Sequence, residues 1–263
     1  YVRTLAIREK VLGPEHPHTA MSLNNLAIFY QDQGLYSQAE PLLIRALAIL
    51  EKALSPEHPY TVTNLSNLAL LYMKQGFYSK AVPLEKRSLN KRLIFIQKEA
   101  PYMTIAERQS FLALHDTFFY FAPTFALKTK EGLKMALFSR LNRQGLLEEI
   151  ERRQSQLANL PGPQQVISQE LRRVNQQIAS KDLNQEQRTK LSKRKQALER
   201  KLYRLLPELK PRIVEVDQVA KRIPPSGVLV EYQRHESFLP TNSDDEKLGE
   251  PRYFAFILKP NGE

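Results

Sequence analysis

The first third of the chain repeats itself at an interval of 42 residues. Residues 5–42 and 47–84 align at this offset without a gap, and 23 of the 38 paired positions are identical. Composition alone would give roughly two or three identities over such a length. A period of this size is typical of repeat proteins, in which each unit packs against its neighbours. We therefore expect a stacked, curved array in this part of the chain.

Each unit is predicted to form two helices. Apolar residues at positions i, i+3, i+4 and i+7 mark one face of the first helix: Leu23, Leu26, Ala27 and Tyr30. Gly34 is a C-terminal stop signal, and a second helix is predicted from about Tyr36 to Leu54. A Pro-Glu-His-Pro loop ends that helix, because proline cannot continue it. His16 and His58 occupy equivalent positions in these loops, and a loop-capping role is favoured over a metal site.

The order Asn-Leu-Ala, Tyr, Gly, Tyr, Ala, Pro in both units resembles the tetratricopeptide repeat. The 42-residue period with its His-Pro loop is similar to the kinesin-light-chain type of that family. The resemblance covers residues 1–96. Residues 1–12 resemble the second helix of an earlier repeat, so at least one further repeat is expected upstream.

In that family the first helix of each pair lines a concave groove. The resemblance implies that the amides of Asn25 and Asn67 hold the backbone of a bound peptide; a hydrogen bond within the array is the alternative. Helical spacing adds six residues to the predicted groove: Met21, Ile28, Asp32, Thr63, Leu70 and Lys74. The family's carboxylate-clamp lysine would fall at Met21 or Thr63 and is absent. Binding of a free C-terminus is therefore not expected.

Residues 97–130 are predicted to form aromatic-rich capping helices. Thr104 and Glu107 have the spacing of a capping box. Seven large apolar residues follow within eleven positions: Phe111, Leu112, Leu114, Phe118, Phe119, Tyr120 and Phe121. One helix face cannot hold so many, so we expect a helix buried on several sides that covers the end of the array.

Residues 131–210 contain 17 Lys or Arg against 9 Asp or Glu, and they are predicted to form a basic helical spacer. The first helix is expected to run from Glu131 to about Leu160, where Pro161-Gly162-Pro163 ends it. An antiparallel hairpin should follow, with Asn184 as a helix cap. Its two helices carry heptad-like, coiled-coil seams: Ile167, Leu171, Val174 and Ile178 on one, and Leu191, Leu198, Leu202 and Leu205 on the other.

The second helix of this hairpin carries a dense run of basic residues: Arg188, Lys190, Lys193, Arg194, Lys195, Arg200, Lys201 and Arg204. Such a density can bind phosphates, and nucleic-acid binding is one alternative function. A solvated helix face that pairs with acidic neighbours is the other interpretation. Tyr203 is the only aromatic residue here, so the segment has no stacking platform for single strands.

Residues 211–263 predict a short helix near Val216 and two strands, 228–232 and 253–258, joined by an acidic loop. The second strand is nearly all apolar, which implies burial on both faces. The order of these strands resembles the opening of a CHAT domain, a caspase-like α/β module of bacterial proteins that often follows such repeats. The resemblance implies a peptidase with a His–Cys dyad. Neither catalytic residue can be assigned, since the chain has no Cys and His235 lies in the first loop.

The predicted fold class is mainly α: a tetratricopeptide array (1–96), capping helices (97–130), a helical hairpin (131–210) and the first strands of an incomplete CHAT-like domain (211–263). The absence of Cys excludes disulfides, thiolate metal sites and a cysteine nucleophile within these residues. No apolar run reaches the roughly 18 residues that span a bilayer. We therefore predict no catalytic, metal or cofactor site, a cytoplasmic location, and a chain that begins inside a longer protein.

The favoured function is a protein-interaction scaffold, which recruits or senses a protein or peptide partner for a CHAT peptidase that this chain does not complete. A basic helical module that binds nucleic acid is the first alternative. A non-catalytic, structural CHAT protein is the second.

Overall fold

The computed structural model describes residues 1–126, 128–179, 183–207, 209–236 and 251–262, except for the side chains of residues 116–121, 123, 233–236 and 251–254. The chain divides into two compact units, which are described separately. The first contains Tyr1–Phe95, Phe118–Arg143 and Ile213–Glu263, and the second contains Ile96–Thr117 and Gln144–Arg212. The predicted sequence domains, with boundaries at residues 96, 130 and 210, stay predictions.

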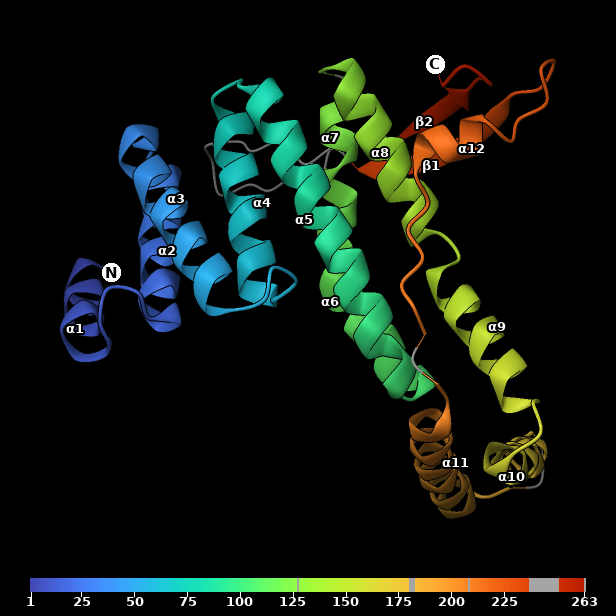
Figure 1. The fold of residues 1–263 in the computed structure, drawn as a ribbon. Coiled ribbons are helices and arrows are strands. Elements are labelled where there is room, and N and C mark those ends of the chain that lie inside the picture. Colours follow the sequence, from blue (N-terminus) through green and yellow to red (C-terminus); the bar gives the residue numbers. More distant parts are fainter. Residues whose placement is uncertain (127, 180–182, 208, 237–250, 263) are drawn as a thin grey trace. The chain divides into compact units, whose positions relative to one another are not determined.

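Helices dominate the described part of the chain (Figure 1). The repeat region contains α1 (Val2–Leu12), α2 (Pro17–Asp32), α3 (Tyr36–Ala53), α4 (Pro59–Lys74) and α5 (Tyr78–Glu99). The middle of the chain contains η1 (Ala100–Tyr102), α6 (Ile105–Phe121), α7 (Pro123–Ala126), α8 (Lys130–Arg143), α9 (Leu146–Ala158), α10 (Pro163–Ile178) and α11 (Gln185–Leu205). The last elements are α12 (Val216–Ala220), β1 (Leu229–Glu236) and β2 (Pro251–Leu258).

The second proline loop ends α3, as predicted, and both loops also start the first helix of a repeat, at Pro17 and Pro59. Nδ1 of His16 accepts a hydrogen bond from the backbone N–H of His18 at 3.1 Å, and Nδ1 of His58 accepts one from Tyr60 at 3.2 Å. These histidines are the N-caps of α2 and α4, which confirms their loop-capping role. Gly34 follows α2 with a φ of 75°, a left-handed conformation that glycine adopts without steric cost.

An apolar core joins the first three helices. Ala20 and Leu23 of α2 pack with Ala46, Ile49 and Leu50 of α3, and each of the five is at most 3% exposed. Partly buried Leu5 of α1, together with Leu42 and Leu54, packs against this cluster. Burying one such large aliphatic side chain stabilises the fold by about 1.5–3 kcal/mol. The core therefore lies between successive helices, as the repeat pattern predicts.

Ion pairs between second helices repeat with the same period. Glu9 of α1 lies 2.8 Å from Arg45 of α3, and Glu51 of α3 pairs with Arg87 of α5. Both residues of the second pair stand 42 positions after those of the first. The side chains are partly exposed, so each pair contributes at most about 1 kcal/mol. They nevertheless show that α1, α3 and α5 meet through the same contact.

In the first unit, α8 contacts segments that are distant in sequence. The side-chain amide of Asn142 bonds to both backbone groups of Val214, because Nδ2 donates to the carbonyl and Oδ1 accepts from the N–H, each at 2.8 Å. Arg140 lies 3.3 Å from Glu231 of β1. Lys86 of α5 lies 3.3 Å from Glu215, which is the N-cap of α12. These polar contacts fix the chain on both sides of the short helix that the sequence predicts here.

The two strands form an antiparallel hairpin, with Leu229 opposite Leu258 and Glu236 opposite Pro251. The expected burial of 253–258 on both faces is wrong for the side chains that are described. Phe256 and Leu258 are buried, whereas Ile257 is 59% exposed. In an antiparallel pair, successive side chains point to opposite faces, and only one face of this hairpin is covered. The acidic residues 237–250 lie outside the described residues.

The predicted single helix from Glu131 to about Leu160 is wrong. Helix α8 ends at Arg143, and α9 begins at Leu146. Gly145 separates them with a φ of 68°, and this left-handed residue interrupts the helical hydrogen-bond ladder. The polar composition of 131–160 concealed the break, since a glycine inside a helical pattern is often tolerated.

In the second unit, α10 and α11 form the predicted antiparallel hairpin. Ile167 of α10 packs with Leu202, Tyr203 and Leu206, while Leu171 and Leu198 lie against this cluster. The proposed seam residue Leu205 is 46% exposed, and the next residue, Leu206, is buried in its place. The prediction is wrong there because residue 206 already lies beyond the helix, where the backbone becomes extended and turns its side chain inward.

The helix starts of the second unit agree with the sequence. The Thr104 N–H donates to Glu107 at 2.8 Å, and the Glu107 N–H donates to Thr104 Oγ1 at 3.3 Å, which confirms the capping box. Asn184 and Gln187 form a second capping box at the start of α11.

The predicted burial of α6 is wrong for Leu114. Its side chain is 75% exposed, because it lies on the opposite side of α6 from buried Leu112. The side chains of residues 118–121, and the predicted cover they give to the array, lie outside the described residues.

A fully buried arginine organises the second unit. Nε of Arg108 donates to the Ala100 carbonyl at 2.7 Å, and Nη2 donates to the Pro101 carbonyl at 3.2 Å. The guanidinium carbon lies 4.5 Å from the centre of the Tyr203 ring. Burial lowers the pKa of Arg108, and the nearby Tyr203 opposes that shift. One side chain of α6 thus connects the η1 turn with α11.

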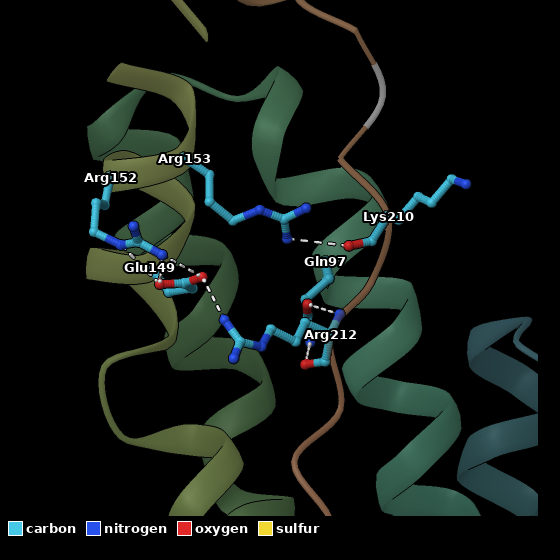
Figure 2. Close-up of polar contacts among 6 residues, drawn as sticks. All are labelled: Gln97, Glu149, Arg152, Arg153, Lys210 and Arg212. Carbon is cyan, nitrogen blue, oxygen red and sulfur yellow. Dashed lines mark hydrogen bonds and ion pairs between the residues drawn. The ribbon is translucent and has the colours of Figure 1, made fainter. Parts of the chain in front are cut away.

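Figure 2 shows how side chains hold the extended chain that follows α11. Gln97 of α5 is buried and pairs with Arg212 as a neighbouring strand would, since its Oε1 accepts from the Arg212 N–H at 2.7 Å and its Nε2 donates to the carbonyl at 3.1 Å. Arg153 of α9 donates to the Lys210 carbonyl at 3.0 Å. Glu149 lies 3.6 Å from the Arg212 guanidinium.

Changing Gln97 to Ala should release this extended segment. Two hydrogen bonds are lost, which costs about 1–3 kcal/mol. Hydrogen exchange of the Arg212 amide should become at least about tenfold faster, because a cost of 1.4 kcal/mol corresponds to that factor. Lys98→Ala, at the exposed neighbouring position, is the control. Equal exchange in both variants would show that Gln97 does not hold the segment.

Candidate functional site

The eight predicted groove residues lie at equivalent positions of α2 and α4. Asn25 and Asp32 are exposed, and the other six are partly exposed: Met21, Ile28, Thr63, Asn67, Leu70 and Lys74. None of the eight is buried, in contrast to Leu23, Leu26, Leu65 and Leu68 on the same helices. The helical spacing therefore separates an accessible face from a core face as predicted. Peptide binding by that face stays a prediction.

The two asparagines expected to bind a peptide differ in their surroundings. Nδ2 of Asn67 donates to Oδ1 of Asn24 at 2.9 Å, and Nδ2 of Asn64 donates to the same oxygen at 3.1 Å. Asn67 thus makes the hydrogen bond within the array that was its alternative role. The side chain of Asn25 is exposed and has no hydrogen-bond partner among the described residues. Its amide keeps both its donor and its acceptor for a ligand.

Asn24 is a residue of this face that sequence reasoning missed. It is partly exposed, and it joins α2 to α4 by accepting both amide hydrogen bonds. The repeat comparison hides it, because Ser66 stands at the equivalent position 42 residues later. The adjacent pair Asn24-Asn25 was the available signal, since two amides in succession on a helix are uncommon in a core.

The other side of the repeats is fixed by a buried phenol. Tyr72 of α4 donates its hydroxyl to Glu40 of α3 at 2.7 Å. Burial, and then the hydrogen bond and negative charge of Glu40, raise the pKa of Tyr72 to about 12. Lys80 lies 4.9 Å from the centre of the Tyr72 ring. The phenol therefore stays protonated and keeps donating to Glu40, which holds α4 against α3.

A second polar group is buried in the last repeat. Glu85 and Arg92 of α5 are 1% and 3% exposed. Ser88, which lies between them in the sequence, is fully buried. The residues 42 positions earlier in α3 are apolar core residues: Leu43, Ala46 and Leu50. The Ser88 hydroxyl lies 2.7 Å from that of Ser66 and donates to the Val62 carbonyl at 3.1 Å. The repeat core therefore changes from apolar to polar at α5.

The buried carboxyl of Glu85 has an unusual acidity. Burial raises the pKa of Glu85 to about 7, although the Arg92 charge and a hydrogen bond from Ser66 act in the opposite direction. Burial also lowers the pKa of Arg92 to about 10. Because the Glu85 carboxyl titrates near neutrality only in the folded state, the stability of the fold depends on pH through this residue.

The eight basic residues of α11 separate into two groups. Arg194 pairs with Glu170 at 2.5 Å, Lys195 with Glu199 at 3.8 Å, and Arg200 with Glu107 at 2.5 Å. The Arg200 hydrogen bond is the largest cause that lowers the pKa of Glu107 to about 2. Arg188 donates to the Leu183 carbonyl at 3.3 Å. The predicted pairing with acidic neighbours is therefore confirmed for three of the eight.

Four of the eight have no carboxylate partner within the described residues: Lys190, Lys193, Lys201 and Arg204.

The described residues contain no group of three His, Cys, Asp or Glu that could hold a metal ion. No described helix is long and apolar enough to cross a membrane.

Replacing Glu85 with Gln should change how stability depends on pH. The unfolded carboxyl titrates near 4.5 and the folded one near 7, so the folded state retains the proton across this window. The stabilisation is complete below pH 4.5 and is lost as the pH rises to 7, a change of roughly 3 kcal/mol. Gln cannot lose a proton, so the variant should gain stability relative to the wild type over the same window.

Urea unfolding followed by circular dichroism at pH 4.5, 5.5, 6.5 and 7.5 would measure this difference. Glu99→Gln removes a carboxylate from the exposed end of the same helix and controls for net charge. A constant difference between Glu85→Gln and the wild type would mean that Arg92 keeps the buried carboxylate ionised throughout.

Comparison with known families identifies the first part of the chain. Residues 19–92 match a tetratricopeptide repeat model, and residues 1–18 match a second tetratricopeptide repeat model. No curated protein matches the chain. These matches agree with the helical hairpins, the capped loops and the accessible face of α2 and α4. Residues 1–92 are tetratricopeptide repeats.

Proposed function

We propose that the repeats bind a protein partner through an extended segment that lies along α2 and α4. Tetratricopeptide repeats generally mediate protein–protein interaction. The observation that carries the proposal is the amide of Asn25, which is exposed and free of partners among the described residues, at the centre of the accessible face. One side-chain amide can donate to a peptide carbonyl and accept from a peptide N–H, so it recognises backbone without selecting a side chain.

The residues beside Asn25 define the chemistry of the segment. Met21 and Ile28 are one turn away on either side and offer apolar surface for alternate side chains of a ligand. At the far end of the face, Asp32 and Lys74 stand at equivalent positions with opposite charges. Because no lysine stands at residue 21 or 63, we propose an internal segment of the partner rather than its free C-terminus.

The larger role that we propose is recruitment for a CHAT-type cysteine peptidase, in a cytoplasmic protein of which this chain is a part. The support is the order of the chain: repeats, helical hairpin, and the strand pair β1–β2 that resembles the start of such a domain. We expect no proteolysis from these residues themselves, since they include no Cys. The alternative is a CHAT-like domain that is inactive and purely structural.

Peptide selection would test the groove. A library of random 12-residue peptides is displayed on phage and selected on the whole chain, and a selected peptide is then titrated by fluorescence anisotropy. Asn25→Ala should weaken binding by about three- to tenfold, the effect of losing one or two net hydrogen bonds. Asn175→Ala, at an exposed position of α10, is the matched control and should bind as the wild type does.

Equal binding by Asn25→Ala, Met21→Ala and the wild type would place the binding surface elsewhere. Selection of peptides only through a free C-terminal carboxylate would contradict the internal-segment proposal. The peptidase proposal has its own test, which is cleavage of a protein substrate by the longer natural protein. Cleavage that disappears when a downstream Cys is changed to Ala supports it, and no Cys-dependent cleavage favours the structural alternative.

A further inference from the structure

The four unpaired cations of α11 lie along one face of the helix. At about 100° per residue, Lys190, Lys193, Lys201 and Arg204 fall within about 80° of one another, over a length of about 21 Å. We call these four residues the α11 basic stripe. All four are exposed, and Ala197 occupies the middle of the same face, so no long side chain interrupts the stripe.

The charge along the stripe is not balanced by neighbours. The described part of α11 contains two acids, and Glu199 is 2% exposed on the other side of the helix, where it pairs with Lys195. Glu186 lies one turn before Lys190, at the start of the helix. Arg194 and Arg200 border the stripe and are themselves exposed beside their carboxylate partners. The face is therefore positive from residue 190 to residue 204.

The stripe also lacks what a protein interface usually needs. Between Lys190 and Arg204 this face presents no large apolar side chain, whereas stable protein interfaces depend on a buried apolar or aromatic centre. A polyphosphate backbone requires only positioned cations. The one aromatic residue of the segment, Tyr203, is 8% exposed and lies against Arg108, so it cannot stack on an unpaired base.

We propose that the α11 basic stripe binds the phosphate backbone of duplex nucleic acid, independently of sequence. Duplex DNA carries regularly spaced charges along its axis, and a straight helix face about 21 Å long spans about six phosphates of one strand at about 3.4 Å each. The stripe offers three ammonium groups and one guanidinium as point contacts. It has no group placed to read base edges, so affinity should depend on salt and length rather than on sequence.

The test uses the whole chain and a fluorescein-labelled 20-base-pair DNA duplex, with an RNA duplex of the same sequence as a second probe. Four phosphate contacts predict a slope of about −3.6 for log K against log salt, hence about a 150-fold loss of affinity from 50 to 200 mM salt. The variant with Lys190→Gln, Lys193→Gln, Lys201→Gln and Arg204→Gln should lose at least about tenfold in affinity at 50 mM salt.

The matched control removes the same charges elsewhere, through Lys128→Gln, Lys130→Gln, Lys221→Gln and Arg222→Gln, all at exposed positions. It should keep the affinity and the slope. A two-site variant, Lys193→Gln with Lys201→Gln, should reduce the slope by about 2 and preserves the test if the four-site variant loses helicity.

Three results would overturn the proposal. The first is no duplex binding at 20 mM salt. The second is an equal loss in the matched control, which would indicate a response to net charge alone. The third is competition by poly-glutamate as strong as that of unlabelled duplex at equal charge, which would assign the stripe to acidic polypeptides.

Discussion

A two-helix hairpin in this chain cannot cover its own apolar face, and the rest of the repeat region follows from that constraint. Ala20 and Leu23 are buried only because α3 and α1 supply the other side of their cluster. The histidine caps and the left-handed glycines serve this stacking, since they set where each helix starts and ends. The face of α2 and α4 that stacking does not use carries Asn25 and its neighbours, so the accessible face is a product of the same periodicity.

Beyond the repeats, buried polar side chains that hydrogen-bond to the backbone hold extended segments in place. Gln97 and Asn142 each present one amide to both backbone groups of an extended residue, Arg212 in the second unit and Val214 in the first. Arg108 satisfies two carbonyls of the η1 turn in the same way. Buried donors and acceptors of this kind must be paired, so these side chains specify the path of segments that have no regular secondary structure.

The predictions from the sequence were most accurate within the repeats, where the same pattern occurs twice. The helix bounds of α2 and α3, the caps at His16 and His58 and the accessible face follow from a pattern that occurs twice. The sequence predicted less where a residue acts alone. Glu85 and Arg92 are charged, so no apolar pattern marks them as the core residues that they are. The hydrogen bond from Asn67 to Asn24 needs a partner that differs between the two repeats, since Ser66 stands at the position equivalent to Asn24. Leu205 and Gly145 show the limit of helical periodicity, which assumes that the helix continues.

The ion pairs between second helices have a direction. Glu9 and Glu51 face Arg45 and Arg87 of the following helix, but the next position in this series, residue 93, is a fully buried leucine. Helix α5 therefore has no carboxylate at the position that Glu9 and Glu51 occupy in α1 and α3. A duplicated hairpin could be inserted between α3 and α4 and would find a complementary charge on both sides. The same hairpin added after α5 would find no carboxylate at residue 93 and would lack this ion pair, a loss of at most about 1 kcal/mol.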